Sequence, residues 1–189
     1  LLVLDVGNTN TTLGVYDGQR LAHSWRLASE HHRTVDEYGV LCRTLLLLAQ
    51  IDSSAISNIA ISSVVPVLNF TLNKMAEVYF GTRPLFVTSE NSGMPVLYDD
   101  PSEVGADRVV NAVAAFAKYG GPCIAVDFGT ATTFDAISQT GEYLGGVIYP
   151  GIQVAADALF QRAARLRNTE IRRPAKVIGT NPASSVQSG

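Results

Sequence analysis

The sequence predicts an α/β protein with an internal duplication. Short runs rich in Val and Ile alternate with longer segments whose apolar residues recur every three or four positions, the patterns of strands and helices. The order of three strands followed by a helix occurs near the start of the chain and again after residue 120. In both copies the first strand ends in an Asp-x-Gly triplet, at Asp5 and at Asp127.

Composition limits the class of protein. The chain has 189 residues, of which 47% are hydrophobic and 16% charged, values typical of a globular protein with a buried core. A net charge of −3 gives no sign of a nucleic-acid-binding surface, and no apolar run is long enough to span a bilayer. Cys42 and Cys123 are isolated in apolar stretches, which favours reduced thiols. We therefore expect a soluble, cytoplasmic protein that has no nucleic acid or membrane partner.

The first half is expected to be a domain of residues 1–119. Its third strand follows Asp17-Gly18, the strongest hairpin signal in the chain. Strands are predicted over residues 1–6, 11–16, 20–27, 56–65 and 84–88, and helices over residues 35–50, 68–80 and 104–119.

The second half is expected to be a domain of residues 120–189, separated from the first by a cleft. Strands are predicted over residues 122–128, 132–138 and 143–148, and a helix over residues 151–166. No closing strand or helix end is visible after Pro182. The second half is therefore expected to be incomplete at its C-terminus.

The segment that begins at Asp5 has the chemistry of a phosphate-binding turn. Gly7 allows a tight turn, and the hydroxyls of Thr9 and Thr11 together with backbone N–H groups can donate to phosphate oxygens. The Asp5 carboxylate would repel phosphate unless a hydrated Mg²⁺ lies between them. A plain hairpin, in which Asn and Thr side chains satisfy the turn backbone, is the alternative.

The second copy makes that alternative less attractive. Asp127, Gly129 and Thr130 repeat the arrangement, again after an apolar strand. A buried charge costs several kcal/mol unless it is compensated, so two such carboxylates indicate a function. The chain contains no G-x-x-x-x-G-K-[ST] loop, so the nucleotide phosphates would be held in another way.

A third segment, residues 99–108, combines four carboxylates with one Arg before a helix. Acidic residues near a helix start are stabilised by the helix dipole. Gly105 is harder to explain, because a Gly one turn inside a helix is unfavourable unless something packs closely there. Asp107 could accept a proton from a substrate hydroxyl, and Arg108 could bind a carboxylate. The two residues could equally form a local ion pair.

The two loops in two halves resemble the actin-like ATPase and sugar kinase superfamily. That resemblance implies ribonuclease H-like halves with mixed five-stranded sheets, and one loop from each half on the nucleotide phosphates. More specifically, the chain is similar to type III pantothenate kinases over essentially its whole length. The motifs that carry this similarity are DVGNTNT from Asp5, PSEVGADRVVNA from Pro101, VDFGTATTFD from Val126, YLGGVIYPG from Tyr143 and the final QSG.

The family resemblance implies that ATP phosphorylates the primary hydroxyl of pantothenate, the first step of coenzyme A synthesis, in a homodimer. It implies Asp107 as the proton acceptor, Asp127 as the ligand of K⁺ or NH₄⁺, and Asp5 as a ligand of Mg²⁺ through water. The implied ATP-binding residues are Asp5, Val6, Gly7, Asn8, Thr9, Asn10, Thr11, Thr12 and Thr130. The implied pantothenate-binding residues are Tyr98, Gly105, Ala106, Asp107 and Arg108.

One departure from the family pattern concerns Pro182. The family carries Thr in a Gly-Lys-Asn-Thr run, whereas this chain has Gly179-Thr180-Asn181-Pro182. Either Thr180 replaces that Thr or the contact is lost. Two other functions therefore stay open, a nucleotide-dependent regulatory protein on the same fold and a kinase for another small hydroxy acid.

Overall fold

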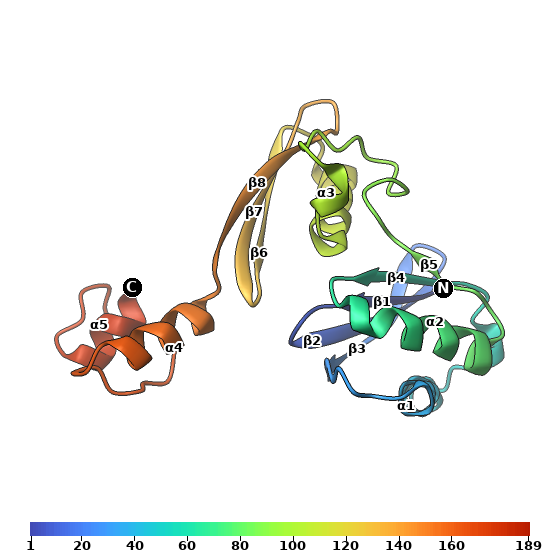
Figure 1. Ribbon diagram of the computed structural model, residues 1–189, viewed down its shortest axis with the longest axis horizontal. Coiled ribbons are helices and arrows are strands. Elements are labelled where there is room, and N and C mark those ends of the chain that lie inside the picture. Colours follow the sequence, from blue (N-terminus) through green and yellow to red (C-terminus); the bar gives the residue numbers. More distant parts are fainter. The chain divides into compact units, whose positions relative to one another are not determined.

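The structure, a computed structural model, describes residues 1–189 (Figure 1). The chain divides into two compact units, Leu1–Ala125 with Asp135–Gly145, and Val126–Phe134 with Gly146–Gly189. These boundaries fall within strands and differ from the predicted division at residue 119. The predicted domains and the cleft between them therefore remain predictions.

A five-stranded mixed sheet organises the first unit, as predicted. Its strand order is β3-β2-β1-β4-β5. β1 pairs antiparallel with β2 and parallel with β4, β2 pairs antiparallel with β3, and β4 pairs parallel with β5. The strands are β1 (Leu2–Val6), β2 (Asn10–Asp17), β3 (Arg20–Ala28), β4 (Ile59–Ser63) and β5 (Leu85–Phe86).

Helices α1 (Val35–Leu48) and α2 (Pro66–Phe80) bury their apolar faces in one core with β1, β2 and β4. Thr34 begins α1 with a capping box in which Glu37 is the partner, so two N–H groups at the helix start are satisfied. Pro66, which directly follows the strand predicted over residues 56–65, occupies the first turn of α2, where its missing N–H is not needed.

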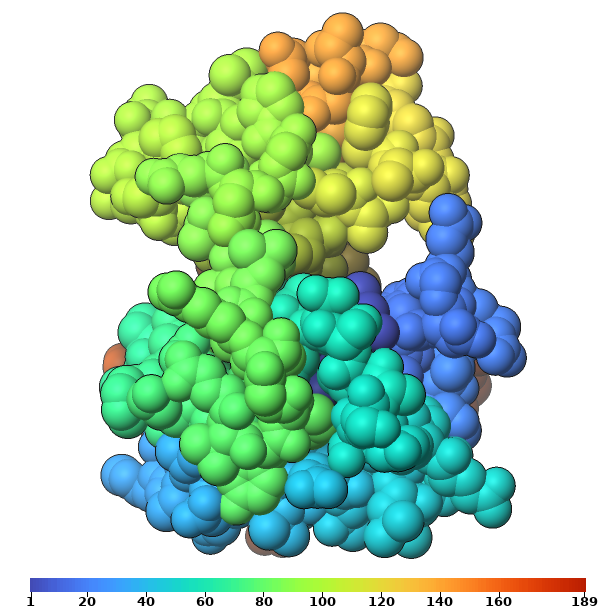
Figure 2. All heavy atoms as spheres, turned by 90° about the vertical axis from the view of Figure 1, so that its right-hand side faces the viewer, coloured from blue at the N-terminus to red at the C-terminus, as the bar shows by residue number.

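Helix α3 (Ala106–Tyr119) lies on the opposite side of the sheet from α1 and α2 (Figure 1). It follows a short 3₁₀ turn, Pro101–Glu103. Its buried residues Val109 and Ala112 join a second apolar cluster with Ile137 and Tyr143. Figure 2 shows the long green segment between β5 and α3 running over the surface of the first unit.

A second sheet has the order β6-β7-β8, with β6 (Cys123–Phe128), β7 (Ala131–Ile137) and β8 (Tyr143–Pro150). These three strands match those predicted over residues 122–128, 132–138 and 143–148, whereas the five-stranded sheet that the superfamily resemblance implies for each half is not seen here. Helix α4 (Ile152–Arg162) ends four residues before the predicted limit of residue 166. The order of three strands followed by a helix does occur twice, as the sequence predicted.

Helix α5 (Pro182–Ser188) was not predicted. Asn181 caps it and forms a capping box with Ser184, while Pro182 occupies the first turn. The departure from the family pattern at Pro182 thus has a local structural role as a helix start. None of the helices is long and apolar enough to cross a membrane.

Candidate active site

Gly105 is the N-cap of α3, with φ −56° and ψ 140°, and not a residue inside the helix as the sequence had suggested. The reason for a Gly is close packing. A Cβ on Gly105 would lie 2.7 Å from Asp107 Oδ1 and 3.3 Å from Val64 Cγ1. The Asp107 carboxylate therefore occupies space that any side chain at position 105 would claim.

Asp107 lies in the first turn of α3, where the helix dipole stabilises a negative charge. Its Oδ1 accepts a hydrogen bond of 2.7 Å from the backbone N–H of Arg108. Gly105 and Ala106 line a pocket of about 370 Å³ together with hydroxyl side chains, among them Ser63 at the end of β4 and Thr88 in the segment after β5. A carboxylate beside a pocket at a helix start is in a position to orient a substrate hydroxyl.

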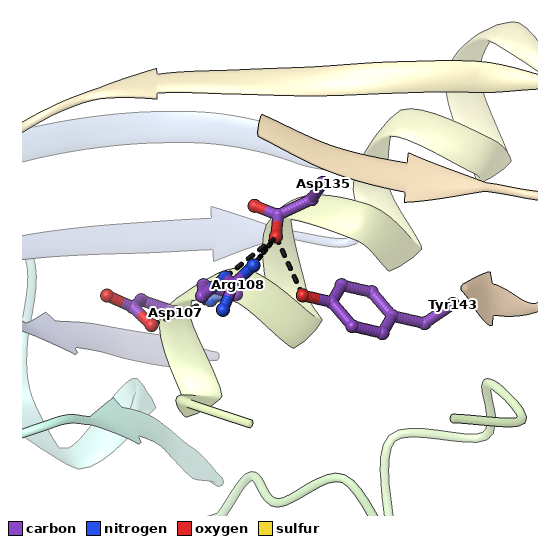
Figure 3. A network of polar contacts seen from close by, with 4 residues as sticks. All are labelled: Asp107, Arg108, Asp135 and Tyr143. Carbon is purple, nitrogen blue, oxygen red and sulfur yellow. Dashed lines mark hydrogen bonds and ion pairs between the residues drawn. The ribbon is translucent and has the colours of Figure 1, made fainter. Parts of the chain in front are cut away.

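The guanidinium of Arg108 is engaged by a carboxylate that sequence analysis did not single out. Nε donates to Asp135 Oδ1 over 2.7 Å, and Nη2 lies 2.7 Å from the same oxygen. The Tyr143 hydroxyl donates to that oxygen as well, also over 2.7 Å. Figure 3 shows the three side chains converging, with Asp107 next to Arg108 along α3.

This network is buried. Exposure is 8% for Arg108, 1% for Asp135 and 0% for Tyr143. Burial, followed by the hydrogen bond to Asp135, raises the pKa of Tyr143 well above its usual range. Burial alone would lower the pKa of Arg108, but the bond and charge of Asp135 outweigh it and raise the pKa. The guanidinium is therefore charged, and Asp135 compensates that charge.

Tyr143 also connects this network to the loop that carries Tyr98. Its backbone N–H donates to the Pro95 carbonyl and its carbonyl accepts from the Leu97 N–H, each over 2.8 Å. The rings of Tyr98 and Tyr143 are 6.4 Å apart and tilted by 58°. Gly145, with φ 120°, lies against the Tyr98 ring. Two predicted substrate contacts, Tyr98 and Arg108, thus both adjoin Tyr143.

The turn between β1 and β2 carries most of the predicted ATP-binding residues. The Gly7 N–H donates to the Asn10 carbonyl over 3.0 Å, which closes the turn. Asp5, Asn8, Thr9 and Asn10 are exposed, as a phosphate-binding loop requires, whereas Val6 belongs to the core.

Thr11 differs from the expectation for this loop. Its side chain is fully buried, and its Oγ1 lies 2.8 Å from the Ser29 hydroxyl. Because the hydroxyl is held in the interior between β2 and the end of β3, it does not face the exposed turn. The sequence argument that it donates to phosphate is not supported by this position.

Asp5 lies in a row of oxygen-bearing side chains across three strands. Thr12 and Ser62 are its register partners on β2 and β4, so the three side chains share one face of the sheet. They line a cavity of about 390 Å³ to which α3 contributes residues including Asn111. Asn111 is one helical turn from Asp107 on the same face of α3.

The second loop belongs to the second unit. The Gly129 N–H donates to the Ala131 carbonyl, and the Gly151 N–H donates to the Thr130 carbonyl, each over 2.9 Å. A Cβ on Gly151 would clash with the Gly129 and Thr130 carbonyls, so the loop packs tightly against the start of α4.

Asp127 is exposed, as is Asp5. Water can solvate both carboxylates, so neither needs the compensation that a buried charge would require. The two residues still share one position, at the end of the first strand of each set of three.

No group of three or more His, Cys, Asp and Glu side chains is placed to hold a metal ion. A single carboxylate is nevertheless enough for Mg²⁺, which keeps several waters and takes one or two protein carboxylates together with substrate phosphates. The exposed Asp5, flanked by Thr12 and Ser62, could serve in that way.

Asp135 and Tyr143 are the site residues that sequence reasoning missed, although both lie in motifs it quoted. The available signal was the position of Asp135 on β7. It lies two residues before Ile137, and alternate strand residues share a face, so the pattern turns a carboxylate toward an apolar core. Such a carboxylate needs a cationic partner.

The turn that follows Asp5 comes at the end of β1, and the Asp107 carboxylate lies in the first turn of α3. This fold and this site fit a kinase that acts on a small molecule. The chain belongs to the type III pantothenate kinase family, whose model matches residues 1–189. It is 58% identical to a type III pantothenate kinase of Koribacter versatilis, over all of this chain and 73% of that relative. Identity is 55% to a type III pantothenate kinase of Anaeromyxobacter sp., over all of this chain and 75% of the relative.

A comparison with a solved structure supports the fold of this chain but not a function. The chain superposes with a TM-score of 0.58 on a Campylobacter jejuni protein described as a Baf family transcriptional activator. Sequence identity is 22%, and the match covers all of this chain and 72% of the other. The shared fold does not transfer the function in that description.

Proposed function

We propose that this protein phosphorylates the primary hydroxyl of pantothenate with ATP, the first step of coenzyme A synthesis. The observation that carries the proposal is that relatives more than half identical to the whole chain are type III pantothenate kinases. The site agrees, because phosphoryl transfer needs positioning and charge neutralisation more than covalent chemistry.

Asp107 is the proposed proton acceptor. Its position in the first turn of α3, beside the pocket lined by Gly105 and Ala106, would let it orient the hydroxyl of pantothenate and take its proton. Arg108 and Tyr98 would contact the rest of the substrate. The absence of a side chain at Gly105 leaves the space that the carboxylate uses.

The turn that follows Asp5 is the proposed ATP phosphate site. The exposed Asn8, Thr9 and Asn10 would offer backbone N–H groups and polar side chains to phosphate oxygens. Asp5 would hold Mg²⁺ through water, and the metal would neutralise phosphate charge. In the second unit Thr130 would contact ATP, and Asp127 would bind K⁺ or NH₄⁺.

The family resemblance also motivates a homodimer in the cytoplasm. Light scattering of the purified protein measures its mass directly, and a monomeric mass at micromolar concentration would contradict this part of the proposal.

A substrate panel with coupled detection of ADP tests the proposed activity. We expect ADP release that requires pantothenate and that rises when Na⁺ in the buffer is replaced by K⁺ or NH₄⁺. Turnover of another hydroxy acid in preference to pantothenate would favour the kinase of different specificity. ATP binding without turnover of any panel member would favour the regulatory protein.

A further inference from the structure

Asp135 is the convergence point of three chain segments. Its Oδ1 contacts Arg108 from α3 and Tyr143 from β8, while Asp135 itself comes from β7 (Figure 3). Both contacts with Arg108 use the Nε and Nη2 side of the guanidinium. The Nη1 side is thereby turned away from Asp135.

Such contacts restrict a side chain that is otherwise among the most mobile. Arg has several rotatable bonds, and its planar guanidinium presents donors in fixed directions. The charge-assisted hydrogen bond from Nε and the ion-pair contact of Nη2, each over 2.7 Å to a carboxylate that is 1% exposed, restrict the guanidinium to one orientation. The ring of Tyr143, whose centroid is 5.8 Å from the guanidinium carbon, limits its movement on a further side.

Tyr143 holds the other predicted substrate contact as well. Backbone hydrogen bonds join it to Pro95 and Leu97, the residues just before Tyr98, and its ring contacts that of Tyr98. The backbone of Tyr143 therefore fixes the loop that carries Tyr98, while its side chain contacts the Tyr98 ring and, through Asp135, holds Arg108.

We propose that Asp135 and Tyr143 are positioning residues for substrate binding, which hold the Arg108 guanidinium in the single orientation that meets pantothenate. They act through Arg108 and Tyr98 and do not touch the reacting atoms. This inference rests on the proposed function, because it assigns the residues that shape the pantothenate side of that same site.

The test removes only the Tyr143 hydroxyl. Tyr143→Phe keeps the ring and its packing, while Asp135 loses one of its donors. We expect KM for pantothenate to rise about tenfold, since a hydrogen bond to a charged buried group is lost, while KM for ATP stays within about twofold. Asp135→Asn should change the same parameter in the same direction and by more.

The matched control is Tyr79→Phe. The Tyr79 hydroxyl donates to Asp36 over the same distance of 2.7 Å, but both residues lie on the surface formed by α1 and α2. We expect this variant to keep both KM values. If folded Tyr143→Phe protein has a KM for pantothenate within about twofold of the wild type, Asp135 and Tyr143 are structural only and the proposal is wrong.

An NMR measurement separates this proposal from the proposed function. The Arg108 Nε–H signal should be protected from exchange in the wild type and broadened in Tyr143→Phe. An unchanged signal would overturn the positioning role even if the protein is a kinase. Absence of pantothenate turnover by the wild type would instead overturn the proposed function, and this inference would fall with it.

Discussion

The Asp107 carboxylate packs against Gly105, the N-cap of α3, so closely that a Cβ on residue 105 would lie 2.7 Å from Asp107 Oδ1. Gly105→Ala should therefore displace the carboxylate. We expect kcat to fall about tenfold, since small displacements of a positioned group are enough to slow a reaction. Steady-state kinetics measure the effect. In an Asp107→Asn background the same substitution should change kcat little, and additive losses in the double variant would contradict the contact.

Asp107→Asn tests the proton acceptor. The amide keeps the shape of the side chain but cannot take a proton, so kcat should fall by a factor of about 10² to 10⁴. ATP binding, measured by calorimetry, should remain. The control is Asp99→Asn, which changes an exposed carboxylate in the segment before α3. Near wild-type kcat in Asp107→Asn would remove Asp107 from this role.

The buried ion pair should dominate the stability of the α3 region. Asp135→Ala leaves the Arg108 charge buried without its partner, and we expect a loss of about 3–5 kcal/mol in the free energy of unfolding. The exposed pair of Asp17 and Arg20, 3.6 Å apart, is the comparison, and Asp17→Ala should lose less than about 1 kcal/mol. Urea unfolding measures both variants.

Replacing both partners of the buried pair extends this test. Arg108→Met with Asp135→Leu removes both charges, so it should be less destabilising than Asp135→Ala alone. A double variant that is the less stable of the two would show that the hydrogen bonds themselves, and not the isolated charge, govern stability here.

The proposed metal site predicts a specific change in Mg²⁺ dependence. Asp5→Asn removes the charge that would attract the hydrated cation, so half-maximal activity should require at least about tenfold more Mg²⁺. Titration of activity with MgCl₂ at saturating pantothenate measures this. Ser24→Ala, a change in the wall of the same cavity, is the control. Unchanged Mg²⁺ dependence in Asp5→Asn would contradict the assignment.

Cys42 should behave as a reporter of unfolding. Burial raises the pKa of its thiol to about 12, so almost no thiolate is present in the folded protein at pH 8. We expect alkylation of Cys42 by iodoacetamide only when the protein unfolds. Mass spectrometry of labelled peptides distinguishes it from Cys123. Rapid labelling of Cys42 in native conditions would contradict its burial.

The same pKa gives a dependence of stability on pH. The unfolded thiol loses its proton near pH 9, whereas the folded thiol keeps it up to about pH 12. Because the folded state then binds more protons than the unfolded state, stability should fall as pH rises through this interval. Cys42→Ala should show a smaller fall over the same range in urea unfolding.

Much of the fold could be predicted because its signals are local. Alternating strands, the Asp17-Gly18 turn and helical spacing give the five strands and three helices of the first unit to within a few residues. Helix α5 was missed because Pro182 was interpreted only as a lost family contact. Its capping by Asn181 and Ser184 was a readable start signal.

The candidate site was less predictable for a physical reason. Asp107 and Arg108 are adjacent in the sequence, which left a local ion pair between them open as an alternative to roles in substrate binding. The partner that compensates the Arg108 charge lies 27 residues further along the chain, on β7. The strand pattern indicates that Asp135 is buried, but it does not show which cation Asp135 meets. The burial of Thr11 likewise depends on Ser29, at the end of a different strand.

The position of Asp135 bears on where the chain can be divided. A shortened protein that ended at residue 119, the predicted domain limit, would contain Arg108 but neither Asp135 nor Tyr143. It would also expose the apolar residues of α3 that pack on Ile137. The first sheet and its helices are thus contiguous in sequence but not self-sufficient, and excision should be attempted only with the β7–β8 hairpin retained.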